Sequence, residues 1–443
     1  MNAPVPSTLN SLISQTEDDL IALYLSDNRP WVVAYSGGKD STAVLQLTVS
    51  ILKRLGTKAK KHVFVLSSDT HVEAPNVAAY VHGALRNIEK AAVEHNWPIT
   101  VRLEHPKPEE SFWGKLIGKG YPPPSRWFRW CTSNMKIKPS RRAIDQIAQQ
   151  YGSVLLLLGT RYSESIQRGR TMQAREVNSK GLNPHHEIPN ALVASPIANW
   201  TTDEVWEYLT QEACPWGADH HFLLSLYRQA NGGECPIVLD LNTPSCGGSR
   251  FGCWTCTVVK EDKSMQGFVD SGVTEFLPLM DFRNWLIELR DKPGYRSEVK
   301  RNNSLGHGPF LPSARQEILD RLLALEQEVG SPLITDDELS AIQAEWQLEF
   351  DYAGIGAKIA GKYGRSMIVS ENKIPAGESE LLEQAALRHD VPPELVQALL
   401  DLRHRKWPSL DKWGAKAGLE KDVGLLIEKA TKQAEFVADT EQR

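Results

Sequence analysis

Residues 31–42 read WVVAYSGGKDST, a short apolar run followed directly by a glycine-rich turn. The run over 31–35 predicts a buried strand, and apolar residues return at helical spacing over 43–55. In such a strand–turn–helix, glycines let backbone N–H groups approach an anion, and the helix N-terminus adds partial positive charge. The predicted phosphate-binding residues are Ser36, Gly37, Gly38, Lys39, Asp40, Ser41 and Thr42.

The same alternation continues along the first half of the chain. Strands are predicted at 62–66, 99–103 and 154–158, and helices at 8–27, 76–95 and 141–150. Strands that alternate with helices form a doubly wound parallel sheet, an α/β fold whose ligands bind beyond the carboxyl ends of the strands. Asp69 follows the second predicted strand, and the loop Gly159–Arg161 follows the fourth.

The composition excludes several classes of protein. The 443 residues suggest two or three domains at about 150 residues each, and 41% hydrophobic with 24% charged residues is ordinary for a globular chain. No apolar run approaches the ~18 residues of a membrane span, and no secretory signal is visible, so we expect a cytoplasmic protein without a membrane partner. Cytosolic thiols stay reduced, so the six cysteines are not expected to form disulfides.

The net charge of −5 conceals a division along the chain. Residues 311–443 carry 24 acidic and 16 basic side chains, whereas residues 111–144 contain no acid at all. This acid-free segment holds eight bases: Lys115, Lys119, Arg126, Arg129, Lys136, Lys138, Arg141 and Arg142. Cations interleaved with Trp127, Phe128 and Trp130 suit phosphates and stacked bases, so we expect a nucleic-acid partner rather than a merely solvated face.

The cysteines suggest a metal centre. Cys253 and Cys256 form a C-x-x-C pair, with Cys246 seven residues earlier and Cys131 far upstream. Four thiolates can bind zinc or a [4Fe–4S] cluster, and the cluster is favoured because structural zinc more often uses two C-x-x-C pairs. Zinc, a redox pair and simple burial remain alternatives. Cys235 also competes with Cys246 as a ligand.

Several motifs together resemble a known family. The loop SGGKDST resembles that of the PP-loop ATP pyrophosphatases, which cleave ATP between the α and β phosphates and adenylate an acceptor oxygen. A further set of matches resembles the adenylyl-sulfate (PAPS) reductase branch over about residues 30–257: Asp69, Thr70 and Glu73, Arg129–Cys131, Lys136–Pro139, Gly159, Arg161, Glu164, Ser165 and Arg168, and Ser195–Ile197. The branch usually has glycine at the position of His71. Its reductases also carry a cysteine near the C-terminus, but no cysteine follows Cys256, so we do not expect reduction of PAPS.

With the cysteines and the basic segment, the chain resembles the sulfurtransferases of DNA phosphorothioation, the DndC family. The resemblance implies that ATP adenylates a DNA phosphate and that sulfur then replaces a non-bridging oxygen. It implies that Lys39 holds pyrophosphate, that Asp40 and Asp69 hold Mg²⁺, and that Arg161 and Arg168 stabilise developing negative charge. Cys131, Cys246, Cys253 and Cys256 would bind the [4Fe–4S] cluster. A cysteine desulfurase would donate sulfur, and other phosphorothioation proteins would be partners.

The domain organisation follows from these patterns. We expect an N-terminal helix over 1–28, a PP-loop/PAPS reductase-like ATP domain over 29–212, an irregular Cys-rich subdomain with its connector over 213–310, and a helical C-terminal domain over 311–443. Two alternative functions remain open. One is an iron–sulfur-dependent tRNA thiolase, and the other is an iron–sulfur module that binds or senses nucleic acid without catalysis.

Overall fold

The structure is a computed structural model in two compact units, residues 1–107 with 124–284 and residues 108–123 with 285–443. It describes residues 9–164, 182–184, 188, 190–230, 252–298, 300, 305–349, 351, 354–367, 384, 386–389, 391–406, 420–428 and 430. The division differs from the predicted boundaries because 108–123 leaves the α/β part and packs with the helical part. The predicted Cys-rich subdomain is divided as well, since its first part belongs to the α/β unit.

The first unit is built on a six-stranded sheet of order β3-β2-β1-β4-β6-β5. The strands are β1 (Trp31–Ala34), β2 (Val63–Ser68), β3 (Ile99–Glu104), β4 (Val154–Leu157), β5 (Asn183–Pro184) and β6 (Ala191–Ala194). All neighbours pair in parallel except β5, a two-residue edge strand antiparallel to β6. The predicted doubly wound parallel sheet is therefore confirmed.

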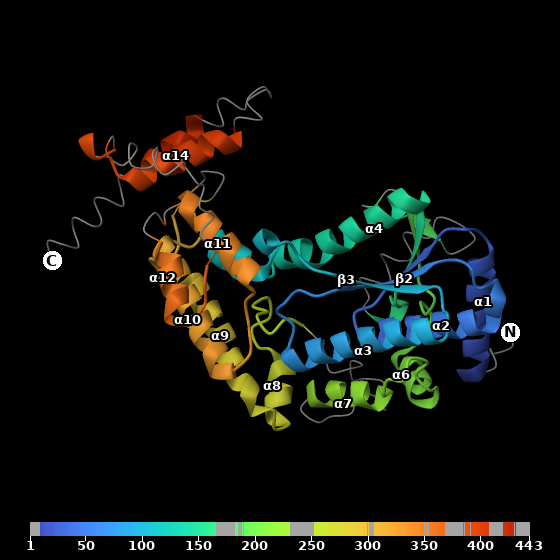
Figure 1. Ribbon diagram of the computed structural model, residues 1–443. Coiled ribbons are helices and arrows are strands. Elements are labelled where there is room, and N and C mark those ends of the chain that lie inside the picture. Colours follow the sequence, from blue (N-terminus) through green and yellow to red (C-terminus); the bar gives the residue numbers. More distant parts are fainter. Residues whose placement is uncertain are drawn as a thin grey trace. The chain divides into compact units, whose positions relative to one another are not determined.

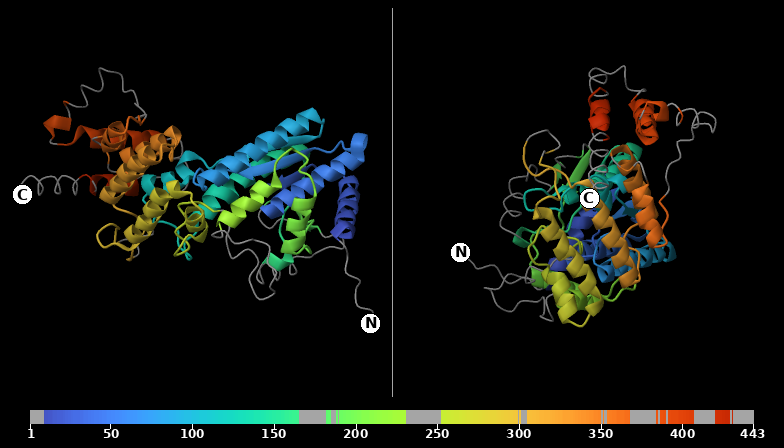
Figure 2. Two further views of the ribbon diagram at one scale, coloured as in Figure 1. Left: turned by 90° about the horizontal axis from the view of Figure 1, so that it is seen from below. Right: turned by 90° about the vertical axis from the view of Figure 1, so that its left-hand side faces the viewer.

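Helices cover both faces of this sheet (Figure 1). On one face are α1 (Leu9–Leu25), α2 (Lys39–Leu55), α3 (Pro75–Glu94), α6 (Thr202–Gln211) and α7 (His220–Ala230), which share one apolar core with Val33 and Val65. On the other face α4 (Lys138–Tyr151) packs on Val32 and Phe64. Successive strand residues point to opposite faces, so a sheet covered on both sides needs continuous apolar strands. Figures 1 and 2 show α2 and α3 side by side, opposite α4.

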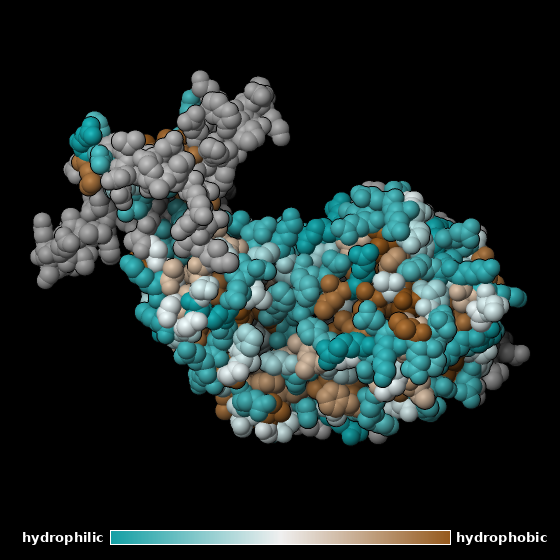
Figure 3. All heavy atoms as spheres, in the orientation of Figure 1, coloured by the Kyte–Doolittle hydropathy of each residue, from teal (hydrophilic) through white to brown (hydrophobic). Residues whose placement is uncertain are grey.

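The strand β3 forms the free edge of the sheet. All six of its residues are half-buried, whereas β1, β2 and β4 are almost wholly buried. Figure 3 shows apolar side chains over this edge among otherwise hydrophilic ones. The helices α8 (Lys263–Asp270) and α9 (Leu277–Asp291) follow later in the chain, and α9 runs into the second unit.

The second unit is helical, with α10 (Pro312–Val329), α11 (Asp336–Glu349), α12 (Ile355–Lys362) and α14 (Pro393–Lys406). Part of its core comes from 108–123. The indole N–H of Trp113 donates to the carbonyl oxygen of Leu333 at 2.8 Å, and that of Trp346 donates to the carbonyl oxygen of Ile117 at 2.8 Å. Both tryptophans are fully buried, so this segment is an integral part of the helical unit.

Two segments differ from the expectations. Residues 213–257 are predicted to be irregular, but α7 lies within them, and its core residues Leu223 and Tyr227 are four apart on one helical face. The strand β6 was not predicted. Among the described residues, no helix is both long enough and apolar enough to cross a bilayer.

Candidate active site

The phosphate loop turns sharply between β1 and α2. Gly37 has a φ of +73°, and a Cβ there would lie 2.5 Å from Cγ2 of Val81, so only glycine fits without adjustment. The Ser41 hydroxyl accepts from the N–H of Ser36 at 3.2 Å and donates to the carbonyl oxygen of Gly38 at 2.9 Å. Gly38 is the N-cap of α2 and has no side chain to bond the first helical N–H groups. The loop therefore has the geometry of an anion site.

Three charged residues meet at this loop. Lys39 is 8% exposed, and its ammonium lies 3.0 Å from Oδ2 of Asp40. Nε of Arg161 donates to Oδ1 of the same carboxylate at 2.8 Å. The loop that carries Arg161 can approach Asp40 this closely because Gly159 has no side chain. A Cβ on Gly159 would lie only 2.7 Å from the carbonyl carbon of Asp40. The structure thus brings together the loop after β1 and the loop after β4.

Arg161 is 2% exposed and fully engaged. Its other nitrogens donate to Oγ of Ser163 at 2.9 Å, to the carbonyl oxygen of Trp200 at 3.2 Å and to Oγ1 of Thr202 at 3.1 Å. A guanidinium with this many fixed acceptors is a positioning group for Asp40.

A tyrosine that sequence analysis missed also reaches the loop. The hydroxyl of Tyr227 accepts from the N–H of Lys39 at 3.4 Å, and the Lys39 ammonium lies 5.7 Å from the centre of its ring. Tyr227 is on α7, in the segment predicted to be irregular, so no periodic signal pointed to it.

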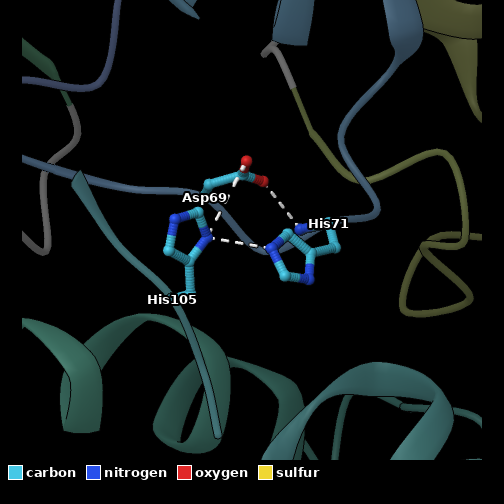
Figure 4. Close-up of side chains that lie close together, drawn as sticks. All are labelled: Asp69, His71 and His105. Atoms are coloured by element: carbon cyan, nitrogen blue, oxygen red, sulfur yellow. Dashed lines mark hydrogen bonds and ion pairs between the residues drawn. The ribbon is translucent and has the colours of Figure 1, made fainter. Parts of the chain in front are cut away.

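Asp69 lies among histidines at the carboxyl end of β2 (Figure 4). Its Oδ1 accepts from the backbone N–H of His71 at 2.8 Å, and its Oδ2 accepts from Nε2 of His82 at 2.9 Å. Nε2 of His71 and Nδ1 of His105 share a hydrogen bond of 2.9 Å. His71 has a φ of +62°, in the left-handed region, which agrees with the glycine usual at this position.

These neighbours affect the pKa of the Asp69 carboxyl group. Burial raises the pKa of Asp69, but the N–H of His71 and the surrounding imidazoles outweigh it, so the pKa lies below its ordinary value. Partial desolvation and the nearby His71 lower the pKa of His105. At neutral pH Asp69 is therefore a carboxylate and His105 a neutral imidazole.

The C-x-x-C pair is attached to the loop at the carboxyl end of β2. Cys253 forms an antiparallel bridge with Glu73, and the N–H of Trp254 donates to the carbonyl oxygen of Val72 at 2.9 Å. Oγ1 of Thr70 lies 3.6 Å from Sγ of Cys253. The loop that follows Asp69 is therefore in direct contact with the cysteine segment.

Cys131 lies near Cys256 and Lys136. It precedes η4 (Thr132–Ile137), a single π-helical turn of a kind common at functional sites. Burial raises the pKa of the Cys131 thiol, and the neighbouring Cys256 raises it further. Burial raises the pKa of Cys253 to about 12 against the opposing charge of Lys136, whose own pKa is raised chiefly by Cys253.

The described cysteines fit an iron–sulfur or zinc centre in their chemistry. Neighbouring thiols with raised pKa values remain protonated until a metal stabilises their thiolates, and the Lys136 ammonium would offset part of the resulting negative charge. Cys214, by contrast, packs at the edge of the apolar core of the first unit. The predicted ligand Cys246, its competitor Cys235 and the predicted catalytic Arg168 all lie outside the described residues.

The acid-free segment is divided between the two units. Arg126, Trp127, Phe128 and Arg129 are exposed in the first unit, and Trp127 is 96% exposed. In the second unit Lys115 is buried, and the ammonium of Lys119 lies 3.7 Å from Oε2 of Glu345. Two of the eight cations are thus used in the helical unit. The exposed cations and aromatic rings gather immediately before Cys131.

A doubly wound sheet with a glycine-rich loop after its first strand defines a nucleotide-binding class of α/β protein. The phosphoadenosine phosphosulfate reductase domain matches residues 30–259, so the chain belongs to that family. The chain is also 32% identical over 194 residues to an uncharacterized protein of Methanocaldococcus jannaschii, covering 44% of this chain and 34% of that protein. The chain therefore spans about a third of the length of that relative.

Solved structures show distant similarity. The phosphoadenylyl-sulfate reductase of Candida auris is 18% identical over 49% of this chain and 91% of its own, with a TM-score of 0.28. The FMN adenylyltransferase of Candida glabrata with FAD and inorganic pyrophosphate is 11% identical over 60% and 77%, with a TM-score of 0.31. The U34-tRNA thiolase NcsA of Methanococcus maripaludis with its [4Fe–4S] cluster is 9% identical over 64% and 79%, with a TM-score of 0.31.

Proposed function

We propose that this protein is an ATP-dependent sulfurtransferase that replaces a non-bridging oxygen of a DNA phosphate by sulfur. The observation that supports this most is the bridge between Glu73 and Cys253. It attaches the C-x-x-C pair to the loop after β2, while the phosphate loop follows the adjacent strand β1. In this proposal the groups that activate the phosphate and those that carry sulfur would act at the carboxyl ends of two adjacent strands.

The proposed first step activates the acceptor. A non-bridging oxygen of the DNA phosphate attacks the α-phosphorus of ATP, the bond from α-phosphorus to the bridging oxygen breaks, and pyrophosphate leaves. Lys39 and the N–H groups of the loop would hold the departing pyrophosphate, because it develops negative charge there. Arg161 would act through Asp40, whose carboxylate it holds.

The second step brings in sulfur. A sulfur nucleophile attacks the adenylated DNA phosphorus, and AMP leaves with the activated oxygen, so one P–S bond replaces one P–O bond. Cys131, Cys246, Cys253 and Cys256 would hold a [4Fe–4S] cluster, which when bound would supply a place for the incoming sulfur atom. A cysteine desulfurase would provide that sulfur in the cytoplasm as a persulfide, and a thiol reductant would supply the two electrons that cleave the S–S bond and release sulfide-level sulfur. Further phosphorothioation proteins would select the DNA site.

The DNA substrate is supported by the exposed residues 126–129. Arg126 and Arg129 can neutralise phosphates, and Trp127 and Phe128 present rings beside them. The exposure of Trp127 also favours the second candidate, a tRNA thiolase, because a ring without a protein partner can stack on a base of single-stranded RNA. A non-catalytic iron–sulfur module is the third candidate.

Product analysis distinguishes these functions. Anaerobically purified protein, supplied with ATP, Mg²⁺, a cysteine desulfurase, its cysteine and a thiol reductant, is given plasmid DNA or unmodified tRNA. Nuclease digests are then examined by mass spectrometry. We expect AMP, pyrophosphate and phosphorothioate dinucleotides, and a ~10²–10³-fold lower rate for Lys39→Ala. Lys53→Ala, an exposed lysine on the same helix, is the matched control.

Other outcomes would exclude the proposal. Thiolated tRNA nucleosides without phosphorothioate would identify the thiolase, and no ATP turnover with either substrate would favour the non-catalytic module. Formation of ADP and phosphate would contradict the assignment of the loop. In cells, deletion of the gene should remove phosphorothioate linkages from genomic DNA.

A further inference from the structure

We propose that Asp69, His71 and His105 bind a divalent transition-metal ion at the carboxyl end of β2, a site separate from the cysteines. One ligand atom from each residue lies within 4.8 Å of the other two (Figure 4). Ligand atoms at 2.0–2.2 Å around a tetrahedral ion lie about 3.3 Å apart, so small side-chain rotations would complete the site. The proposal does not depend on the DNA reaction.

The contacts inside the group suit a cation. Nε2 of His71 and Nδ1 of His105 face each other at 2.9 Å, and Nδ1 of His105 lies 4.0 Å from Oδ2 of Asp69. Two imidazole lone pairs that converge must share one proton unless an ion lies between them. His82 donates to Oδ2 of Asp69 at 2.9 Å and acts as a positioning residue for the carboxylate ligand.

The chemistry of the ligands indicates which ions bind. Two imidazoles with one carboxylate suit Zn²⁺ or Fe²⁺ and leave coordination positions for other ligands. Mg²⁺ prefers oxygen ligands and retains water, so this set differs from the Mg²⁺ role expected for Asp69. His71 is decisive, because the glycine usual at its position would supply no ligand.

Its location connects the two parts of the candidate active site. On α3, Val81 packs on Gly37 of the phosphate loop, and the next residue, His82, bonds Asp69. On the other side, Thr70 lies against Cys253. An ion on Asp69 would therefore lie between the phosphate loop and the cysteines, where its open positions could accept an oxygen of a phosphate.

Cobalt titration tests this site. The full-length protein is freed of metal, titrated with Co²⁺ and followed by visible absorption. Besides any Co²⁺ that the cysteines hold, we expect one Co²⁺ with ligand-field bands of nitrogen and oxygen ligands, displaced by Zn²⁺ but not by excess Mg²⁺. His71→Gly and His105→Gln should each weaken binding at least tenfold, whereas Cys253→Ser and the exposed control His221→Gln should not.

His71→Gly protects the test from a folding artefact, because glycine adopts a φ of +62° without strain. Its circular dichroism and thermal unfolding should match those of the wild type. Unchanged Co²⁺ affinity in both histidine variants would overturn the proposal. So would the loss of every Co²⁺ absorption band in Cys253→Ser.

Discussion

Arg161 shows how a single side chain holds the candidate active site together. It is nearly inaccessible to solvent and connects the carboxylate of Asp40 with the carbonyl oxygen of Trp200 and the hydroxyl of Thr202. Removing the guanidinium leaves Oδ1 of Asp40 and several other acceptors without this donor, although Lys39 still bonds Oδ2. We therefore expect the loss of Arg161 to lower the stability of the protein, and to affect catalysis only through that loss.

We expect Arg161→Met to lower the free energy of unfolding by about 3–5 kcal/mol, because the remaining carboxylate loses its buried partner. Urea denaturation followed by fluorescence measures the change. Arg54→Met is the matched control, since Arg54 pairs with Glu17 and Asp18 at the surface, where an ion pair is worth about 0–1 kcal/mol. Equal losses in the two variants would show that Arg161 does not hold the loop.

Gly37 allows a second test at the residue scale. Gly37→Ala combines a left-handed φ with a collision at Val81, whereas Gly152→Ala, at a φ of +83°, meets no atom within 4 Å. The φ alone costs roughly 1–2 kcal/mol, so Gly37→Ala should destabilise by more than Gly152→Ala. It should also weaken ATP binding, measured by calorimetry, which Gly152→Ala leaves unchanged. Val81→Ala in the Gly37→Ala background should restore part of the lost stability but not the cost of φ.

At the scale of elements, the docking of α7 on α2 depends on a histidine. His220 is buried, and its Nε2 donates to Oε1 of Gln46 at 2.6 Å. Burial lowers the pKa of His220 to about 4. This contact holds α7 in place, and α7 is the helix whose Tyr227 reaches the phosphate loop. The contact between α2 and α7 should therefore be sensitive to acid.

We expect His220 to make the protein less stable in acid. Between pH 6.5 and about 4 the unfolded chain takes up a proton that the folded protein does not, so stability falls as pH decreases through this window. The slope is up to about 1.4 kcal/mol per pH unit. His220→Gln should remove that part of the pH dependence in urea denaturation at pH 7 and pH 4.5, while the exposed His221→Gln should retain it. Parallel pH profiles for the wild type and His220→Gln would contradict the assignment.

At the scale of the whole molecule, two tryptophans of the acid-free segment have opposite environments. Trp113 is fully buried in the helical unit, and Trp127 is 96% exposed in the α/β unit. The sequence does not distinguish the two tryptophans, because both lie among basic and aromatic residues. Substitution of Trp113 and substitution of Trp127 should therefore affect different properties of the protein.

Trp113→Ala should cost about 3–5 kcal/mol of stability, whereas Trp127→Ala should change it by no more than about 0.5 kcal/mol. Nucleic-acid binding should show the reverse, with Trp127→Ala weakening it by about 1–3 kcal/mol for a stacked base. Fluorescence titration at several salt concentrations gives affinity and salt slope. Arg126→Glu should lower the slope by about one unit for each lost phosphate contact. Unaltered affinity in both surface variants would make residues 126–129 a solvated face.

The sequence alone determined the strands β1 to β4 and the phosphate loop, because both depend on local patterns. An apolar run, a glycine turn and helical periodicity over 31–55 suffice to predict β1, the loop and α2. Only the tertiary structure decided which distant residues share the site. The pairing of Val72 with Trp254, the position of Tyr227 and the meeting of His71 with His105 depend on chain crossings that no local spacing encodes. The division of residues 111–144 between two units has the same cause, since burial depends on what each side chain packs against rather than on its own charge or apolarity.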